Sequence, residues 1–390
     1  MSLQNALDAL LKSATDKGEV PGVVAMLTDR EQTLYEGAFG LRRLGSSAAM
    51  SVDTVVLIAS MTKALTSTAA LQLVERGLLD LESPASRWLP DLGAVQVLEG
   101  FDAQGQPRLR APKRAITLKH LLTHTAGFGY EFLSQDIKTW QAVTGTPGFS
   151  SSSYASIKTP LLFDPGERWE YGVSTDWVGM LVQKLSGMKL SDYFAEHLFA
   201  PLGMRDTAIS MRPDMRARLA SIHARLPDGN LVPMELELPQ QPETEMGGQA
   251  LYGTAGDYLK FIRMILRQGQ GEHGRVLKPE TVAAMSRDQL GGLQVPSIHS
   301  IDPQFSNDLP MPEGNPQLWS LAFMINSKPL PTGRKAGSLS WAGLSNCYYW
   351  IDPASGIGGV YLTQILPFAD VKSLPLNFAF EATAYQQLSR

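Results

Sequence analysis

The sequence predicts an α+β protein in which both ends of the chain form a sheet lobe and the middle forms a mostly helical lobe. Strand-like runs occur near each end, helix-like patterns occupy the middle, and a helix-like pattern also lies at each terminus. A chain of 390 residues exceeds the usual single core, so two lobes are expected. We place the sheet lobe in residues 1–53 and 316–390 and the helical lobe in residues 54–315, within one unit spanning 1–390.

The N-terminal part of the chain predicts a helix followed by a hairpin. Leu3, Leu7, Leu10 and Leu11 lie on one face of the opening segment when it is helical. Two β-branched or alternating runs follow, VPGVVAMLTDR and QTLYEGAFG, with polar residues 29–31 between them. This pattern is typical of two paired strands.

The C-terminal part has the same strand character. Its strand-like runs are WSLAFMIN, GSLSWAG, NCYYWID and IGGVYLTQ. Segments 329–333, 344–345 and 353–356 separate them, and a last helix is expected over 376–388. Both termini are therefore expected to contribute to one sheet.

The middle of the chain carries most of the helical patterns. They cover Thr62–Arg76, an LKHLL helix capped by Thr117, Thr175–Leu185, Leu190–Leu198 and Ala255–Arg267. Gly77 is suited to end the first of these helices. Less regular segments are expected to supply the walls of a cleft between the lobes, namely 90–115, 130–154, 234–249 and 290–315.

Composition and charge exclude several classes of partner. The 34 Lys and Arg nearly balance the 38 Asp and Glu without any basic run, so no nucleic-acid partner is expected. The longest apolar stretches, 54–58 and 357–362, are far shorter than the ~20 residues that cross a bilayer, so no membrane partner is expected. The N-terminus lacks a signal-peptide pattern, which predicts a cytoplasmic protein. The single cysteine, Cys347, excludes an intrachain disulfide, and the lack of other cysteines argues against a thiolate zinc site.

The most specific local feature is the segment Ser60-Met61-Thr62-Lys63, which begins an amphipathic helix. Residues three apart share a helix face, so the Ser60 hydroxyl and the Lys63 amine are expected within hydrogen-bonding reach. A lysine with the ordinary pKa of about 10.4 is almost wholly charged at neutral pH, so a lysine base has to be buried or placed near positive charge. By itself the S-x-x-K spacing is common, and it also fits an exposed helix start.

Other motifs accompany Ser60–Lys63 in order along the chain. They are ITLKHLLTHTAG (116–127), Pro165–Tyr171, FAEHLFAPLGMRD (194–206), GGQALYGTAGD (247–257), Trp341–Gly343 and WIDP (350–353). With these motifs the chain resembles the serine β-lactamase-related hydrolases, the superfamily of class C β-lactamases, DD-peptidases and family VIII carboxylesterases. The resemblance implies a single β-lactamase/transpeptidase-like catalytic unit, with an antiparallel sheet, flanking terminal helices and an inserted helical lobe.

The resemblance also implies catalytic roles. Ser60 would be acylated, Lys63 would accept its proton, and Tyr171 stands where the family has its catalytic tyrosine. A phenol beside Lys63 could relay the Ser60 proton to the leaving alcohol. The backbone N–H groups of Ser60 and Leu344 would form the oxyanion hole.

Three further residues are expected to bind substrate. Trp341 and Gly343 occupy the place of the family's Lys-Thr-Gly box, and Gly343 would let substrate approach the strand closely. Tyr130 is expected to line the pocket, with core packing as the alternative.

Two departures from the family pattern bear on the substrate. Val173 stands where the lactamases have Asn, and Trp341 replaces the Lys that would meet a β-lactam carboxylate. Losing a charge-assisted contact costs roughly 1.5–3 kcal/mol of binding. The substrate is therefore expected to be a small neutral ester with an apolar acyl group, with β-lactam turnover a side activity at most.

Patterns that point to other chemistry are weak. His120 and His124 are four apart, but Leu121 stands where metal-dependent hydrolysis needs Glu. The G-x-G-x-x-G match at 269–274 follows a helix, whereas a dinucleotide site requires a preceding strand. The segment 343–347 resembles a nucleophile elbow but lies between strands. We expect neither a metal nor an organic cofactor.

The sequence thus predicts a serine carboxylesterase acting through an acyl-enzyme on Ser60. Three alternatives stay open: an acyltransferase using the same acyl-enzyme, a weak β-lactamase or DD-peptidase-type amide hydrolase, and a scaffold module with a vestigial site. The joint presence of Ser60, Lys63 and Tyr171 disfavours the last. Acyl chain length, enantiopreference, natural substrate and oligomeric state have no signature in the sequence.

Overall fold

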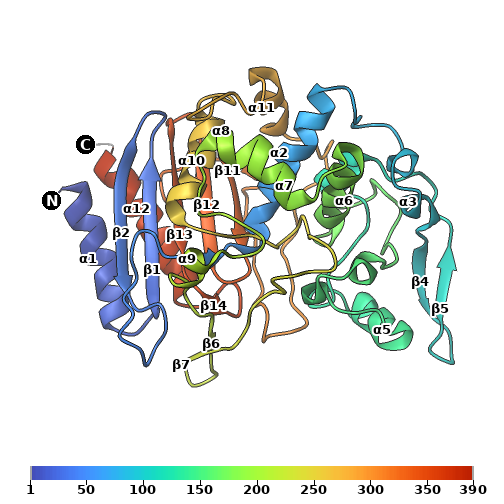
Figure 1. The fold of residues 1–390 in the computed structure, drawn as a ribbon. Helices are drawn as coiled ribbons and strands as arrows, with labels where there is room; N and C mark the ends of the chain where they lie inside the picture. Colours follow the sequence, from blue (N-terminus) through green and yellow to red (C-terminus); the bar gives the residue numbers. More distant parts are fainter. Residues whose placement is uncertain (1, 389–390) are drawn as a thin grey trace.

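The computed structural model describes residues 2–388, in which the two ends of the chain meet in one antiparallel sheet (Figure 1). Ala25 near one end faces Tyr361 near the other. The α+β fold predicted from the sequence, with a sheet from both termini, is confirmed. In spatial order the strands are β2 (Thr33–Gly40), β1 (Gly22–Thr28), β13 (Ile357–Leu362), β12 (Cys347–Asp352), β11 (Leu339–Gly343), β10 (Met324–Asn326) and β9 (Gln317–Trp319).

Helices α1 (Leu3–Asp16) and α12 (Ser373–Leu388) cover one face of this sheet, as Figure 1 shows. Ser2 caps α1, because its Oγ accepts a hydrogen bond from a first-turn N–H at 3.2 Å. α1 buries Leu7 and Leu11, as its sequence pattern predicts. The apolar cluster between the two helices and the sheet also includes Tyr35, Trp350, Tyr361 and Phe380.

The opposite face of the sheet is covered by α10 (Ala255–Leu266), which packs on β1, β12 and β13. Leu259 and Ile262 of α10 share an apolar cluster with Val24 and Val360 of the sheet. α10 thus packs on the sheet, although it lies within residues 54–315, which we assign to the helical lobe from the sequence. Helical periodicity predicts an apolar face, but it cannot identify the surface that this face will meet.

The predicted strand from Trp319 to Asn326 is instead two short strands, β9 and β10, joined by a turn. Ser320 forms the turn, because its Oγ accepts hydrogen bonds from the N–H groups of Ala322 at 3.1 Å and Phe323 at 2.9 Å. A serine side chain that bonds the nearby backbone competes with an extended conformation. This competition divides an apolar run that contains neither Gly nor Pro.

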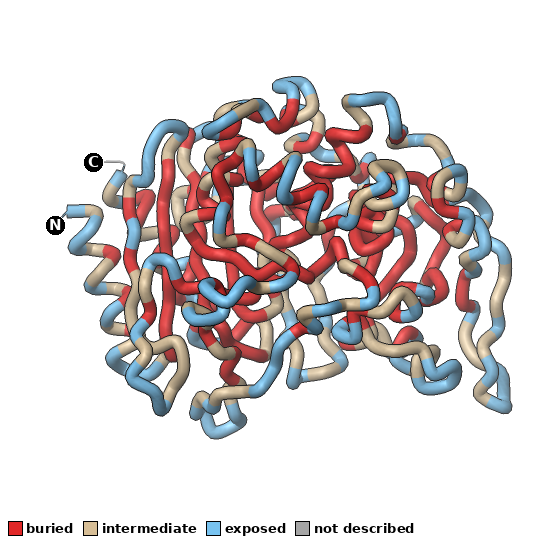
Figure 2. The backbone as a smooth tube through the Cα atoms, viewed as in Figure 1, coloured by how far each residue is buried: buried red, intermediate tan, exposed pale blue. Residues whose placement is uncertain are grey.

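Helix α2 lies at the centre of the molecule, where the backbone is largely buried (Figure 2). Every residue from Thr62 to Leu73 is buried, so α2 is not the amphipathic helix that the sequence predicted. Helices α6 and α7 are among the elements that pack against it, and over this stretch α2 has no solvent-facing side. Besides α1, α10 and α12, the helices are α2 (Thr62–Glu75), α3 (Asp91–Ala94), α4 (Leu118–Leu122), α5 (Gln135–Thr144), α6 (Ser174–Ser186), α7 (Leu190–Phe194), α8 (Ala200–Leu202), α9 (Pro213–Arg216) and α11 (Pro279–Met285).

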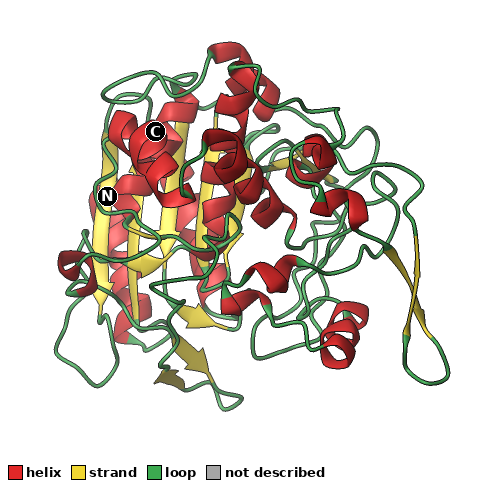
Figure 3. Cartoon of the chain, turned by 45° about the vertical axis from the view of Figure 1, so that its right-hand side comes forward, coloured by secondary structure: helices red, strands yellow, loops and turns green. Residues whose placement is uncertain are grey.

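Short strands form small sheets around this core. They are β3 (Val56–Leu57) with β8 (Tyr252–Gly253), β14 (Ile365–Leu366) with β6 (His223–Arg225) and β7 (Leu231–Pro233), and β4 (Val97–Phe101) with β5 (Pro107–Arg110). The β4–β5 hairpin projects from the end of the molecule farthest from the large sheet (Figure 3). Among residues 2–388, no helix combines the length and the apolar content that crossing a membrane requires.

Candidate active site

Ser60 lies in a tight 3₁₀ turn, Ala59–Met61, directly before α2. The β3–β8 pair leads into this turn, and the Ile58 N–H donates to the Leu251 carbonyl at 3.1 Å. Ala59 has φ +45°, a conformation that a residue with a side chain adopts only where the surrounding structure enforces it. The turn therefore holds Ser60 in a fixed place at the head of α2.

Lys63 is 2% exposed, and its Nζ donates three hydrogen bonds. The acceptors are Ser60 Oγ at 3.3 Å, Tyr130 Oη at 3.1 Å and the Gly248 carbonyl at 2.9 Å. The contact with Ser60 is the one that the three-residue spacing predicts. Three acceptors match the three donors of an ammonium, so the charged form of Lys63 is fully satisfied despite its burial.

Tyr171 lies on the other side of Lys63, just before α6. Lys63 Nζ is 4.7 Å from the centre of the Tyr171 ring, and Tyr171 Oη accepts a hydrogen bond from Trp341 Nε1 at 3.1 Å. The structure thus brings Ser60, Lys63 and Tyr171 together. Trp341 contributes more than the pocket wall that the sequence predicts, because its indole N–H fixes the position of the Tyr171 hydroxyl.

Tyr130 is the phenol that accepts a hydrogen bond from Lys63, a contact that sequence reasoning missed. It lies in the cavity wall as expected, and its ring packs on Phe132 with centroids 5.2 Å apart. Burial, with a contribution from the negative charge of Asp176, raises the pKa of Tyr130 well above its usual value, so the phenol stays protonated. A lone tyrosine in a loop has no spacing to Lys63 that the sequence could reveal.

Gly343 brings β11 against the turn that holds Ser60. A Cβ at this position would lie 2.3 Å from the Ile58 carbonyl oxygen, so glycine is required by the approach of two backbones. This is a different reason from the room for substrate that the sequence suggested. Leu344 lines the same cavity as Ser60. The oxyanion hole formed by the N–H groups of Ser60 and Leu344 stays a prediction.

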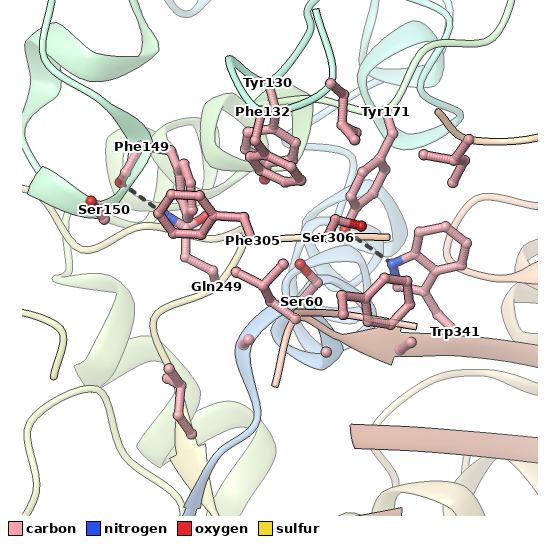
Figure 4. Close-up of a pocket in the computed structure, with 18 of the residues that line it drawn as sticks. Ser60, Tyr130, Phe132, Phe149, Ser150, Tyr171, Gln249, Phe305, Ser306 and Trp341 are labelled. Carbon is pink, nitrogen blue, oxygen red and sulfur yellow. Dashed lines mark hydrogen bonds between the residues drawn. The ribbon is translucent and has the colours of Figure 1, made fainter. Parts of the chain in front are cut away.

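A cavity lies over Ser60 (Figure 4). Its lining includes no Asp, Glu, Lys or Arg among the residues that the structure describes. Apart from Ser60 and the two tyrosines, its polar side chains are Ser150, Gln249, Ser306 and the indole of Trp341. Such a cavity suits a neutral, largely apolar molecule.

The cavity walls come from three of the four segments that the sequence indicated. Segment 130–154 contributes Phe132 and Phe149, segment 234–249 contributes Leu238, and segment 290–315 contributes Ile298 and Phe305. Segment 90–115 contributes no described residue, so that prediction is wrong. Pairing of β4 with β5 forms a hairpin that projects at the end of the molecule farthest from the large sheet.

His124 supports Tyr171 from behind in an aromatic cage. Its ring centre lies 5.1 Å from that of Tyr171, 5.8 Å from that of Trp169 and 5.0 Å from that of Trp319. Burial, aided by the charge of Lys63, lowers the pKa of His124 well below its usual value, so the ring stays neutral. His124 is therefore unsuited to act as a charged acid in this site.

The other sequence patterns have structural explanations. His120 Nδ1 accepts the N–H of Thr117 at 3.2 Å within the cap of α4. Ser345 is buried in a turn, where its Oγ donates to the Leu57 carbonyl at 3.0 Å. Cys347 is buried, and burial raises its pKa to about 12, so its thiol is unreactive near neutral pH. Within residues 2–388, no group of three or more His, Cys, Asp or Glu is arranged to hold a metal ion.

Comparison with known proteins places this geometry among related enzymes. The model of the Beta-lactamase family matches residues 7–380. The monacolin J acid methylbutanoyltransferase of Aspergillus terreus is 34% identical over 397 residues, covering 98% of this chain and 95% of that protein. The lovastatin esterase of Penicillium rubens is 35% identical over 296 residues, covering 73% of each chain. The solved structure of unliganded simvastatin synthase (LovD) from Aspergillus terreus superposes with a TM-score of 0.85 at 32% identity, covering 99% of both chains.

Proposed function

The chain belongs to the Beta-lactamase family, and we propose that it is a serine acyltransferase that moves an apolar acyl group from an ester to an alcohol through an acyl-enzyme on Ser60. The observation that carries this proposal is the 3.3 Å contact between Lys63 Nζ and Ser60 Oγ beneath a cavity without charged walls. The relative named as a methylbutanoyltransferase favours transfer over the hydrolysis expected from the sequence.

The proposed reaction begins when Ser60 Oγ attacks the acyl carbonyl carbon. Its proton passes to the neutral amine of Lys63. For this transfer Ser60 Oγ donates the hydrogen bond to Lys63 Nζ across the 3.3 Å contact, in place of accepting it. The carbon–oxygen bond to the first alcohol breaks, and that alcohol leaves with a proton relayed by Lys63 and Tyr171. The second alcohol then attacks the acyl-enzyme, its proton returns through the same groups, and Ser60 is restored.

The apolar cavity supports transfer for a physical reason. Water gains few hydrogen bonds from walls made of Phe, Leu and Ile side chains, whereas an organic alcohol buries apolar surface there. An alcohol bound above the acyl-enzyme can therefore compete with water, even though water is present at a far higher molarity. The absence of charged lining side chains among the described residues makes a neutral acyl donor and a neutral acceptor the best fit.

The test is product analysis with p-nitrophenyl butyrate and added primary alcohols. The proposal expects butyrate esters of the added alcohol as the main product, with free butyrate increasing when the alcohol is omitted. Formation of free butyrate alone, at every alcohol concentration, would establish a hydrolase instead.

Ester hydrolysis is the second function to consider, and the similarity to lovastatin esterase favours it. It uses the same acyl-enzyme with water as the acceptor. Amide hydrolysis is less well supported, because Trp341 stands in place of the lysine that would meet a β-lactam carboxylate, and its indole N–H donates to Tyr171 instead. Turnover of nitrocefin tests this function. Labelling of Ser60 by a fluorophosphonate distinguishes all of these from a vestigial scaffold.

A further inference from the structure

The backbone of residues 247–251 is held against α2 by side chains of that helix. Thr66 Oγ1 donates to the Gly247 carbonyl at 2.6 Å, and Lys63 Nζ donates to the Gly248 carbonyl at 2.9 Å. A Cβ on Gly247 would lie 2.8 Å from Thr66 Cγ2, so the segment packs tightly on the helix. The position of Lys63 is therefore tied to the position of this segment.

Asp176 approaches the same segment from α6. Its Oδ1 accepts the Gly248 N–H at 2.7 Å, its side chain is fully buried, and its Oδ2 has no hydrogen-bond partner among the described residues. A Cβ on Gly248 would lie 2.8 Å from both carboxylate oxygens, so glycine is what allows this approach. Gly248 thus holds Lys63 at its carbonyl and Asp176 at its N–H.

We propose that Asp176 is a positioning residue whose carboxylate is the buried counter-charge of the Lys63 ammonium and whose hydrogen bond fixes the backbone that Lys63 uses. The inference rests on the proposed function, in which Lys63 takes the Ser60 proton. That proton stays on Lys63 Nζ, and Asp176 accepts none. The carboxylate lowers the free energy of the ammonium that forms as Ser60 attacks.

The titratable groups that face this pair are His124, Tyr130, Glu131 and Tyr171. The pKa of His124 is lowered and that of Tyr130 is raised, so neither carries charge near neutral pH. Glu131 is engaged elsewhere, since its Oε1 accepts the Phe149 N–H at 2.9 Å. Burial raises the pKa of Asp176 to about 6 against the opposing effect of Lys63, so its carboxyl is ionised at pH 7 and above.

The variant Asp176→Asn tests the charge separately from the shape, because Asn retains an oxygen for the Gly248 N–H. The readout is the rate of Ser60 labelling by a fluorophosphonate from pH 5 to pH 10. The labelling rate is expected to rise with pH to a plateau, and this rise is the acid limb of the profile. Without the carboxylate the Lys63 ammonium loses its proton more readily, so we expect the acid limb to move to lower pH by about one unit or more. We also expect the plateau rate to fall about fivefold or more, and the two profiles to converge below about pH 6, where wild-type Asp176 is protonated.

Asp257→Asn is the matched control. Asp257 is also buried and also the third residue of its helix, but its Oδ2 accepts from the Asp206 N–H at 2.6 Å and from Thr207 Oγ1 at 3.0 Å. We expect an unmoved acid limb in this variant. If Asp176→Asn lowers the plateau but leaves the limb in place, its role is only structural and the proposal is overturned. If wild-type Ser60 is not labelled at all, the acyl-enzyme itself is overturned.

Thermal unfolding provides a second test that does not depend on activity. We expect Lys63→Met to lose stability as the pH rises from 5 to 8, because the buried carboxyl then ionises without its counter-charge. The double variant Lys63→Met/Asp176→Asn should unfold at a higher temperature than Asp176→Asn alone. This comparison remains decisive if Lys63→Met by itself folds poorly. Additive effects of the two substitutions would contradict the pairing.

Discussion

The two ends of the cavity over Ser60 are built in different ways. At one end, directional hydrogen bonds fix Lys63 against Ser60 and Tyr130, and another fixes Tyr171 against Trp341. At the other end, the rings of Phe132, Phe149 and Phe305 pack with centroids 5.4 to 6.1 Å apart. Hydrogen bonds specify one geometry, whereas packing of similar rings tolerates rearrangement. We infer that the first end sets the chemistry and the second sets the acyl groups accepted.

Removing the nucleophile should give the largest effect. Ser60→Ala is expected to lower turnover of p-nitrophenyl butyrate by at least about 10⁴-fold, because no acyl-enzyme can form. Steady-state kinetics measures the loss, and an unchanged melting temperature shows that the fold persists. Retention of most of the activity would remove Ser60 from the mechanism.

Tyr171→Phe should have the next largest effect. We expect kcat to fall by about 10²- to 10³-fold with little change in KM, since the hydroxyl is needed during proton transfer and not for substrate binding. The contact of Lys63 Nζ with the ring, 4.7 Å from its centre in Tyr171, would be retained by phenylalanine. A kcat equal to that of the wild type would assign the proton relay to Tyr130, which bonds Lys63 directly.

Trp341→Phe changes the boundary between the two ends of the cavity. It removes the N–H that holds Tyr171 Oη but keeps an aromatic ring, so kcat should fall by about three- to tenfold. Trp350→Phe is the control, because Trp350 is buried in the distant cluster under α12 and its Nε1 has no hydrogen-bond partner among the described residues. Equal effects of both substitutions on kcat would show that Trp341 acts only through packing.

Phe305→Ala changes the apolar end and should have the smallest effect. We expect KM for a hexanoyl ester to rise about three- to fivefold while KM for an acetyl ester stays unchanged, because only the longer chain reaches the lost ring. A series of p-nitrophenyl esters measures this. A uniform change in kcat across the series would contradict the division between chemistry and acyl selection.

Sequence patterns were sufficient for features that repeat or that depend on near neighbours. Alternating and helical periods predicted the sheet and most helices. The spacing of Ser60 and Lys63 predicted their contact, because residues three positions apart at a helix start lie on the same face. The Thr117 cap is local in the same way. Each of these depends on residues within one or two turns of one another.

Individual side-chain contacts between distant segments had no such signal. The hydrogen bonds of Lys63 with Tyr130 and of Trp341 with Tyr171 join segments brought together only by the whole fold. The same holds for the carboxylate of Asp176 against Gly248. The position of α10 on the sheet also depended on which surface remained uncovered, and periodicity does not contain that information.

The pairing of β1 with β13 has a consequence for synthesis of the protein. Val24 pairs with Leu362, and Trp341 and Gly343 also come from the C-terminal part of the chain. A nascent chain that ends before β11 contains Ser60 and Lys63 but lacks the strand that packs on their turn. The serine therefore gains its full surroundings only after β11 has been synthesised, and until then the nascent polypeptide has no complete pocket over Ser60.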